Sequence, residues 1–272
     1  MKKNIIAKEG KVEMKEERKA ERKKSDDIAL SIHGLSKIFK IPHERRYTLF
    51  ENILGILSFD TSYEKFYALK NIDIEIKKGE FIGLIGNNGS GKSTLLKTIS
   101  KILMPTTGEI YLDGRITEFL DLGVGFQDEL TAKENIFLYG AIMGLSREYI
   151  KSKLGEILNF ADVEKFADTK LKSFSAGMRV RLAFATAIQT NPEILLLDEV
   201  LAVGDSDFQK KCYELFKSYK GTGVTIIFAS HNLDDIREFC DRTIYLDKSR
   251  IVMFEKTSKV LEEYDRRHDK VQ

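Results

Sequence analysis

The nine residues GNNGSGKST (86–94) constrain this chain more than any other stretch. They fit the pattern G-x-x-x-x-G-K-[ST], in which glycines let backbone N–H groups turn inward around phosphate groups. A buried-strand sequence, FIGLI (81–85), precedes them, and a helix-like run, TLLKTISKI, follows them. A flexible Gly/Ser loop is the alternative, but such a loop would need neither neighbour. The context therefore predicts a strand-to-helix loop that binds ATP or GTP.

Within this loop, Lys92 is expected to bring positive charge to the β and γ phosphate oxygens, and Ser93 to bind Mg²⁺. The residues predicted to contact the nucleotide are Gly86, Asn87, Asn88, Gly89, Ser90, Gly91, Lys92, Ser93 and Thr94.

Composition sets the limits within which this site must be built. The chain has 272 residues, of which 42% are apolar, so it can bury a sizeable core. Its 44 Lys and Arg nearly balance its 42 Asp and Glu, so charge gives no argument for a nucleic-acid partner. Cys212 and Cys240 each fall in a helical pattern and are expected to be buried free thiols. No apolar run reaches the roughly 20 residues of a spanning helix.

Two regions near the N-terminus differ from the rest of the chain. Residues 1–27 are dense in Lys, Arg and Glu and are expected to form a disordered or loosely helical tail, with contact to anionic lipid as the alternative. Residues 45–59 place apolar side chains on one helical face, which predicts an amphipathic insertion at about 42–65. That insertion either packs on its own domain or lies at a membrane interface.

The remaining pattern predicts a parallel sheet with helices on both sides. Strand-like segments run from Ile28 to Ile41 and from Phe66 to Ile76. Unbroken apolar runs occur in FIGLI, in ILLLD (194–198) and in TIIFAS (225–230), which is typical of strands covered on both faces. Helices are expected from the loop to about Ile102 and over about 131–143, 147–160, 205–219 and 232–240, the second of these starting at a capping box, Thr131-x-x-Glu134.

Polar residues follow each of these buried strands, and the ends of parallel strands meet at one sheet edge. Asp198 is placed to reach the Mg²⁺ shell, and Glu199 to polarise an attacking water. His231 is expected to contact the γ-phosphate. Each has a structural alternative: acids after a strand can cap a helix, and a single strand-end histidine can be a satisfied core residue.

Three small residues, Ser175, Ala176 and Gly177, start another helical run. A helix start without bulky side chains presents free N–H groups and a positive dipole end, which suits a second anion. A chain with one phosphate loop has no second phosphate of its own. We therefore expect two copies to meet head to tail, each offering this helix start to the nucleotide of the other, with close helix packing as the alternative.

In their order along the chain, GNNGSGKST, FSAGM, ILLLDE, AVGD (202–205) and SH (230–231) resemble the nucleotide-binding subunit of ATP-binding cassette transporters. The resemblance covers about residues 28–255. It implies an α/β fold: a P-loop ABC-type ATPase domain with a mostly parallel core sheet, an antiparallel β subdomain and a helical subdomain at about 128–185. Residues 256–272 are expected to form a C-terminal helix.

The resemblance also implies roles for further residues. FSAGM stands where the family has its signature sequence, and Asp205 stands in the family's D-loop. Gln127 resembles the loop glutamine that senses Mg²⁺ and couples to the membrane subunit; an exposed loop amide is its structural alternative. Phe39 matches the aromatic that stacks on adenine, against the alternative of an ordinary strand residue.

Longer stretches, FSAGMRVRLAFATA, LDEVLAVGDSDFQKKC and GFQDELTAKENI, resemble the subfamily that exports lipid-linked polysaccharides such as O-antigen and capsule, together with teichoic-acid exporters. Many members carry another residue at the position of Gln127, so the chain is nearer the general family there. Some members add a C-terminal carbohydrate-binding domain, which is not expected in a chain that ends at Gln272.

The resemblance implies a homodimeric ATPase that uses ATP and Mg²⁺. Two copies would work with two copies of a separate membrane permease, at the cytoplasmic face of the membrane and attached to it through the permease. A lipid-linked glycan would be the transported substrate. A teichoic-acid exporter and a cassette ATPase not coupled to transport are the alternatives.

Overall fold

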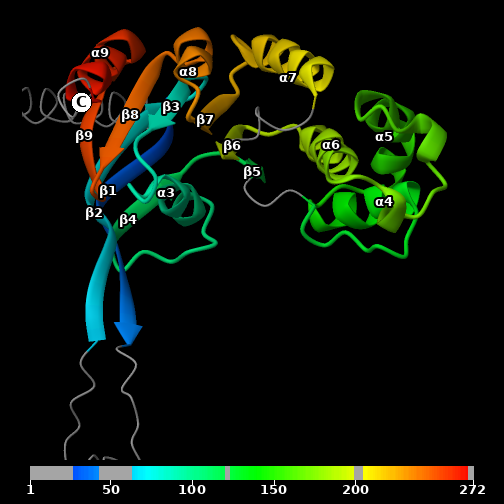
Figure 1. The fold of residues 1–272 in the computed structure, drawn as a ribbon, viewed down its shortest axis with the longest axis horizontal. Coiled ribbons are helices and arrows are strands. Elements are labelled where there is room, and N and C mark those ends of the chain that lie inside the picture. Colours follow the sequence, from blue (N-terminus) through cyan, green and yellow to red (C-terminus); the bar gives the residue numbers. More distant parts are fainter. Residues whose placement is uncertain (1–26, 43–62, 120–122, 199–204, 269–272) are drawn as a thin grey trace, which may run out of the picture.

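The computed structural model describes residues 27–42, 63–119, 123–198 and 205–268. Two sheets form the centre of the described chain, and a group of helices lies to one side (Figure 1). Most of the predicted tail and of the amphipathic insertion, and also Glu199, lie outside the described residues.

The larger sheet is parallel except at one edge, in agreement with the sequence prediction. Its strand order is β5-β6-β7-β3-β8-β9, and only β9 runs antiparallel to its neighbour. The strands are β3 (Phe81–Ile85), β5 (Ile116–Phe119), β6 (Ile194–Asp198), β7 (Thr225–Ala229), β8 (Arg242–Asp247) and β9 (Arg250–Lys256).

The central strands have unbroken apolar sequences because both faces of the sheet are covered. In β3 all five residues are buried. Phe81 and Ile85 point into the core formed with the helices α6 to α9, whereas Ile82 and Leu84 point into the core formed with the smaller sheet. Successive side chains of a strand alternate between faces, so this division follows from the pleat. The phosphate-binding loop therefore starts from a strand that is fixed on both sides.

The smaller sheet is antiparallel, with the order β2-β1-β4, and packs together with helix α3 on one face of the larger sheet. Its strands are longer than predicted, because β1 and β2 continue as a two-stranded arm (Figure 1). Helix α3 ends at Ile99 rather than near Ile102, since Lys101 adopts a left-handed conformation with φ 65°. The elements are β1 (Ile28–Pro42), β2 (Tyr63–Lys77), β4 (Thr107–Leu112) and α3 (Lys92–Ile99).

The helices divide between two hydrophobic clusters, with α6 contributing to both. Helices α7, α8 and α9 cover the larger sheet, and α4, α5 and α6 share a separate hydrophobic cluster. The predicted capping box is confirmed: Thr131 and Glu134 cap α4 reciprocally. Cys240 lies just after α8 rather than inside it, because its extended backbone ends the helix. The helices are α4 (Ala132–Ile142), α5 (Arg147–Phe160), α6 (Ala176–Ala187), α7 (Ser206–Tyr219), α8 (Leu233–Phe239) and α9 (Thr257–His268), with 3-10 turns at Glu164–Phe166, Leu171–Ser173 and Ile188–Thr190.

Candidate functional site

The loop between β3 and α3 needs glycine at three positions, for two different reasons. Gly86, Gly89 and Gly91 all have positive φ, at 149°, 76° and 113°. A Cβ on Gly86 would lie 2.1 Å from the carbonyl oxygen of Leu246, and one on Gly91 would lie 2.6 Å from that of Ala68. Nothing lies within 4 Å of the corresponding position on Gly89, where only the backbone angle demands glycine. The loop is thus held tightly between β8 and β2.

Helix α3 begins with its N–H groups turned toward this loop. Its N-cap residue, Gly91, makes no side-chain cap hydrogen bond, so no side chain occupies the anion-binding end of the helix. The Lys92 ammonium lies within the loop and donates to the carbonyl oxygens of Gly86, at 2.8 Å, and Asn87, at 3.3 Å. Positive charge and helix N-terminus therefore meet at one place, where phosphate groups would bind.

A pocket of about 220 Å³ opens directly over the loop. It joins the loop to His231, which follows β7, the strand adjacent to β3. The predicted meeting of strand ends is therefore present at this edge of the sheet, and the catalytic role of His231 stays a prediction. The pocket is lined by Phe66, Ala68, Asn88, Gly89, Gly91, Lys92, Ser93, Thr94 and His231.

Phe66 lines this pocket and Phe39 does not; the predicted stacking of Phe39 on adenine stays a prediction. Phe39 lies directly opposite Phe66 in the β1–β2 ladder, so the two side chains share a face of the sheet. Both are exposed, at 37% and 49%. Sequence reasoning did not single out Phe66, because its pairing with Phe39 depends on the strand register, which leaves no signal along the chain.

Asp198 ends β6, two strands away from β3 in the sheet, and is half-buried. Neighbouring strands lie about 4.8 Å apart, so the ends of β3 and β6 are roughly 10 Å from each other. The hydroxyl of Ser93 lines the pocket over the loop. Hydroxyl and carboxylate oxygens are the hard donors that Mg²⁺ prefers, and Mg²⁺ commonly keeps waters between itself and protein carboxylates. The residues present thus fit a magnesium ion.

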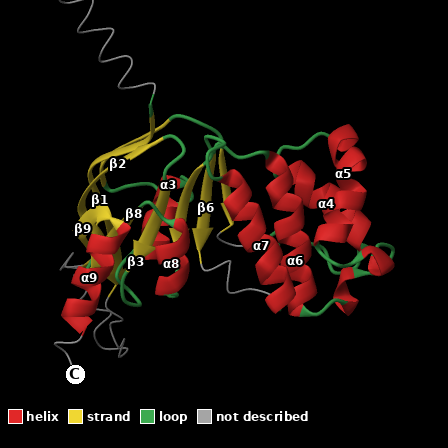
Figure 2. Cartoon of the chain, turned by 90° about the horizontal axis from the view of Figure 1, so that it is seen from above, coloured by secondary structure: helices red, strands yellow, loops and turns green. Residues whose placement is uncertain are grey.

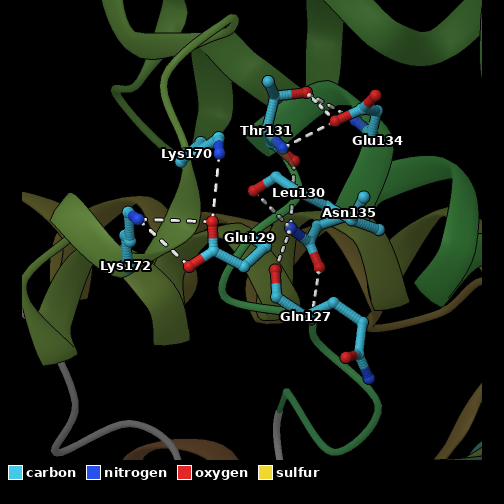
Figure 3. Close-up of polar contacts among 8 residues, drawn as sticks. All are labelled: Gln127, Glu129, Leu130, Thr131, Glu134, Asn135, Lys170 and Lys172. Atoms are coloured by element: carbon cyan, nitrogen blue, oxygen red, sulfur yellow. Dashed lines mark hydrogen bonds and ion pairs between the residues drawn. The ribbon is translucent and has the colours of Figure 1, made fainter.

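Gln127 lies in an exposed loop that a buried asparagine holds in place (Figure 3). The side-chain oxygen of Asn135 accepts the backbone N–H of Gln127 at 2.7 Å. Its amide group donates to the carbonyl oxygens of Gln127, Leu130 and Thr131 at 3.0 to 3.1 Å. Asn135 is fully buried. It binds the backbone of Gln127, whose side-chain amide points away from this network (Figure 3). The sequence prediction missed Asn135, whose signal was a polar residue inside the apolar pattern of α4.

The Gln127 loop is also joined to the segment that leads into α6. The Glu129 carboxylate binds the ammonium groups of Lys170 and Lys172, which lower the pKa of Glu129 (Figure 3). The backbone carbonyl oxygen of Asp128 accepts the backbone N–H of Lys172 at 3.0 Å. The carboxylate of Asp128 pairs with the guanidinium of Arg179, in the first turns of α6, at 2.5 Å. The loop that carries Gln127 is therefore linked to the start of α6 through Asp128.

Among the residues that the structure describes, none packs so closely on the start of α6 that small residues are required there. Ser175 is the N-cap, and its hydroxyl accepts the N–H of Met178 at 3.2 Å. Ser175 and Ala176 are exposed, and a Cβ on Gly177 would meet nothing nearer than the Ser175 hydroxyl at 4.0 Å. The alternative of close helix packing accordingly has no support among the described residues, and the helix start is open to the outside.

Asp205 connects α6 to α7. One carboxylate oxygen caps α7 by accepting the N–H of Phe208 at 3.0 Å, and the other binds Arg181 of α6 at 2.7 Å. Both contacts, the backbone hydrogen bond first, lower the pKa of Asp205. Asp205, the predicted D-loop residue, is thus charged and linked to helix α6 through Arg181.

The two cysteines are free and buried, as predicted. Burial raises the pKa of Cys212 to about 12 and also raises the pKa of Cys240. Both are packed in the core as protonated thiols, away from the pocket over the loop.

A glycine-rich loop of the phosphate-binding pattern after one central strand, with Asp198 at the end of another strand of the same sheet, makes this protein an ATPase of the P-loop class. Residues 69–202 match the family described as ABC transporter. The chain is 40% identical over 235 residues to the ABC transporter protein AbcA of Aeromonas salmonicida, an alignment that covers 86% of this chain and 75% of AbcA. The chain therefore belongs to the ABC transporter family.

Other similar proteins are named for export. The O-antigen export system ATP-binding protein RfbB of Klebsiella pneumoniae is 38% identical over 200 residues, covering 74% of this chain and 81% of RfbB. The teichoic acids export ATP-binding protein TagH of Bacillus anthracis is 37% identical over 229 residues, covering 84% of this chain but only 40% of TagH.

Solved structures agree with this assignment. The dimeric, post-hydrolysis structure of the ATP-binding cassette MJ0796 with ADP and Pi superposes with a TM-score of 0.67 at 28% identity, covering 84% of this chain and 98% of MJ0796. The predicted fold class, with its parallel-rich sheet, antiparallel sheet and helices, is confirmed.

Proposed function

We propose that this chain is the ATP-hydrolysing subunit of an exporter that moves a lipid-linked polysaccharide of the O-antigen or capsule type across the cytoplasmic membrane. The similarity to RfbB supports the substrate class. The similarity to TagH supports a teichoic-acid polymer as the alternative substrate. Both names denote export, which disfavours a cassette ATPase that is not coupled to transport.

One observation carries the proposal for how the motor works. The start of α6 is exposed and made of small residues, and no residue in the described ranges packs against it closely enough to require them. Two copies would assemble head to tail, so that ATP held by the P-loop of one copy meets Ser175 and Gly177 of the other. The similarity to MJ0796, described as a dimeric cassette, supports this arrangement.

The residues around the pocket then divide the chemistry. Lys92 and the N-terminus of α3 hold the phosphates, and His231 contacts the γ-phosphate. Glu199 polarises the attacking water, and Gln127 reports the state of the site to the permease. Ser93 and Asp198 would hold Mg²⁺, which screens the negative charge of the phosphates.

Closure of the dimer moves the permease only if the two are attached. We therefore place two copies of this chain against two copies of a separate permease, at the cytoplasmic face of the membrane. In the described part of the chain, no helix has the length and apolarity that a membrane crossing requires.

The experiment that tests this function uses membrane vesicles that hold the permease, this chain on the cytoplasmic side, and a lipid-linked polysaccharide. ATP should move the polymer to the other leaflet, where it becomes inaccessible to a glycosidase added on the cytoplasmic side. Lys92→Ala should abolish this protection. Transport of a lipid-linked teichoic acid alone would select the alternative substrate, and ATP hydrolysis unaffected by the permease, with neither polymer moved, would overturn the proposal.

A further inference from the structure

The C-terminal helix α9 is firmly attached along its length. Thr257 starts the helix and donates its hydroxyl to the carbonyl oxygen of Cys240 at 2.8 Å. Val260 and Leu261 are buried in the core that covers the larger sheet. The helix lies beside β8 and β9 (Figure 2). Its last turn reaches the P-loop, where His268 contacts Asn87.

The last turn fixes the ring of His268 at two points. Tyr264 packs edge-on against Tyr245 of β8, with ring centroids 5.1 Å apart, and His268 stacks on Tyr264 at 4.0 Å. Nδ1 of His268 lies 2.9 Å from the backbone carbonyl oxygen of Tyr264. The orientation of the ring is therefore set, and with it the direction of Nε2.

Nε2 of His268 meets the side chain of Asn87, the second residue of the P-loop, at 3.1 Å from Oδ1. The backbone oxygen of Asn87 in turn accepts from the N–H of Ser90, at 3.1 Å, and from the ammonium of Lys92, at 3.3 Å. The contact between His268 and Asn87 therefore restrains the part of the loop whose carbonyl oxygens position Lys92. The sequence assigned no role to His268.

We propose that His268 is a positioning residue for ATP binding: through Asn87 it fixes the open shape of the P-loop. Helix α9 and strand β8 support the loop together. Tyr245 of β8 packs against Tyr264 in the last turn of α9, and the carbonyl oxygen of the next residue, Leu246, lies against Gly86 of the loop. The groups assigned to the chemical step, Glu199 and His231, follow other strands, β6 and β7. Loss of His268 therefore weakens binding of ATP and leaves its hydrolysis unchanged.

The test compares two amide replacements that differ in reach. The amide nitrogen of a glutamine comes near the position of histidine Nε2, whereas that of an asparagine reaches only the position of Nδ1. His268→Asn and His268→Ala should raise KM for ATP, and Kd for a fluorescent ATP analogue, about fivefold, the effect of losing one ordinary hydrogen bond, at unchanged kcat. His268→Gln should bind ATP nearly as the wild type does.

Two further variants separate this role from general stability. Glu262→Gln changes an exposed residue of the same helix and should alter neither KM nor the melting temperature. In an Asn87→Ala background, His268→Asn should have no further effect on KM, because its partner is gone. Equal KM in the Asn, Gln and wild-type proteins overturns the proposal, as does a fall of kcat and melting temperature common to Asn and Gln. Since the wild-type Kd is measured directly, these outcomes do not depend on whether the chain drives export.

Discussion

Phe39 and Phe66 illustrate how a single residue can match a sequence pattern without occupying the expected place. Phe39 stands at the family position for the adenine-stacking aromatic, yet the pocket over the P-loop is lined by Phe66. The two lie opposite each other in the ladder and share one face. A flat base needs an aromatic surface within reach of the phosphates, and we propose that Phe66, which lines the pocket, provides it.

We expect Phe66→Ala to weaken binding of ATP about tenfold, since stacking on an aromatic ring contributes of the order of 1 kcal/mol or more. Phe39→Ala should have a smaller effect. Titration with a fluorescent ATP analogue measures both. Tyr67→Ala is the matched control, because the next residue along β2 points to the opposite face of the sheet. Equal losses for Phe66→Ala and Tyr67→Ala would show that the arm, and not the ring, is responsible.

Much of the residue-level site could be predicted because its chemistry is local. The three P-loop glycines, Lys92 and Ser93 were recognisable from spacing, since a phosphate cradle is built from consecutive residues. Asn135, Phe66 and His268 were not. Each acts on a residue distant in sequence or on an adjacent strand, and no spacing along the chain reveals such a partner.

At the scale of elements, the loop 127–131 is held by one side chain of α4. Asn135 satisfies one N–H and three carbonyl groups of that loop and its helix. On its other side, the loop pairs with the segment before α6, where Leu171 donates to Leu130 and Thr131 bridges to Lys170. The loop that carries Gln127 and the segment leading into α6 are thereby linked by backbone hydrogen bonds.

Asn135→Ala should lower the free energy of unfolding by roughly 2 kcal/mol, because a buried donor and several acceptors lose their partner. Thr131→Ala, which removes only the cap of α4, should cost about 1 kcal/mol. Chemical denaturation measures both differences. If Thr131→Ala proved the more destabilising, the cap rather than the asparagine would hold the loop.

At the scale of the whole molecule, the P-loop and the start of α6 are two separate helix N-termini on one chain, and we propose that each binds part of a nucleotide. The P-loop has Lys92 and a pocket above it, whereas the start of α6 is exposed to solvent. A second copy would complete both sites at once, because a symmetric head-to-tail dimer uses the same two surfaces twice.

Mixed dimers test this arrangement. Lys92→Ala and Gly177→Asp should each abolish retention of labelled ATP in a Glu199→Gln background, in which slow turnover leaves the nucleotide in place. Mixing the two proteins should restore about a quarter of the wild-type sites, since half of randomly formed dimers are mixed and each has one intact site. Gly177→Asp should fold normally, because among the described residues a Cβ at this position meets nothing nearer than the Ser175 hydroxyl at 4.0 Å. No recovery, with mixed dimers demonstrated by a tag on one copy, would place both anion sites in the same copy.

By itself, the sequence determined the class of this protein. Spacing within GNNGSGKST, unbroken apolar strands and a capping box are local signals, and each depends on backbone geometry over a few residues. The tertiary structure decided which aromatic lines the pocket, which asparagine holds the Gln127 loop, and that the last turn of α9 reaches Asn87. These depend on contacts between segments as far as 181 residues apart, whose meeting is set by sheet order and core packing and leaves no periodic trace in the chain.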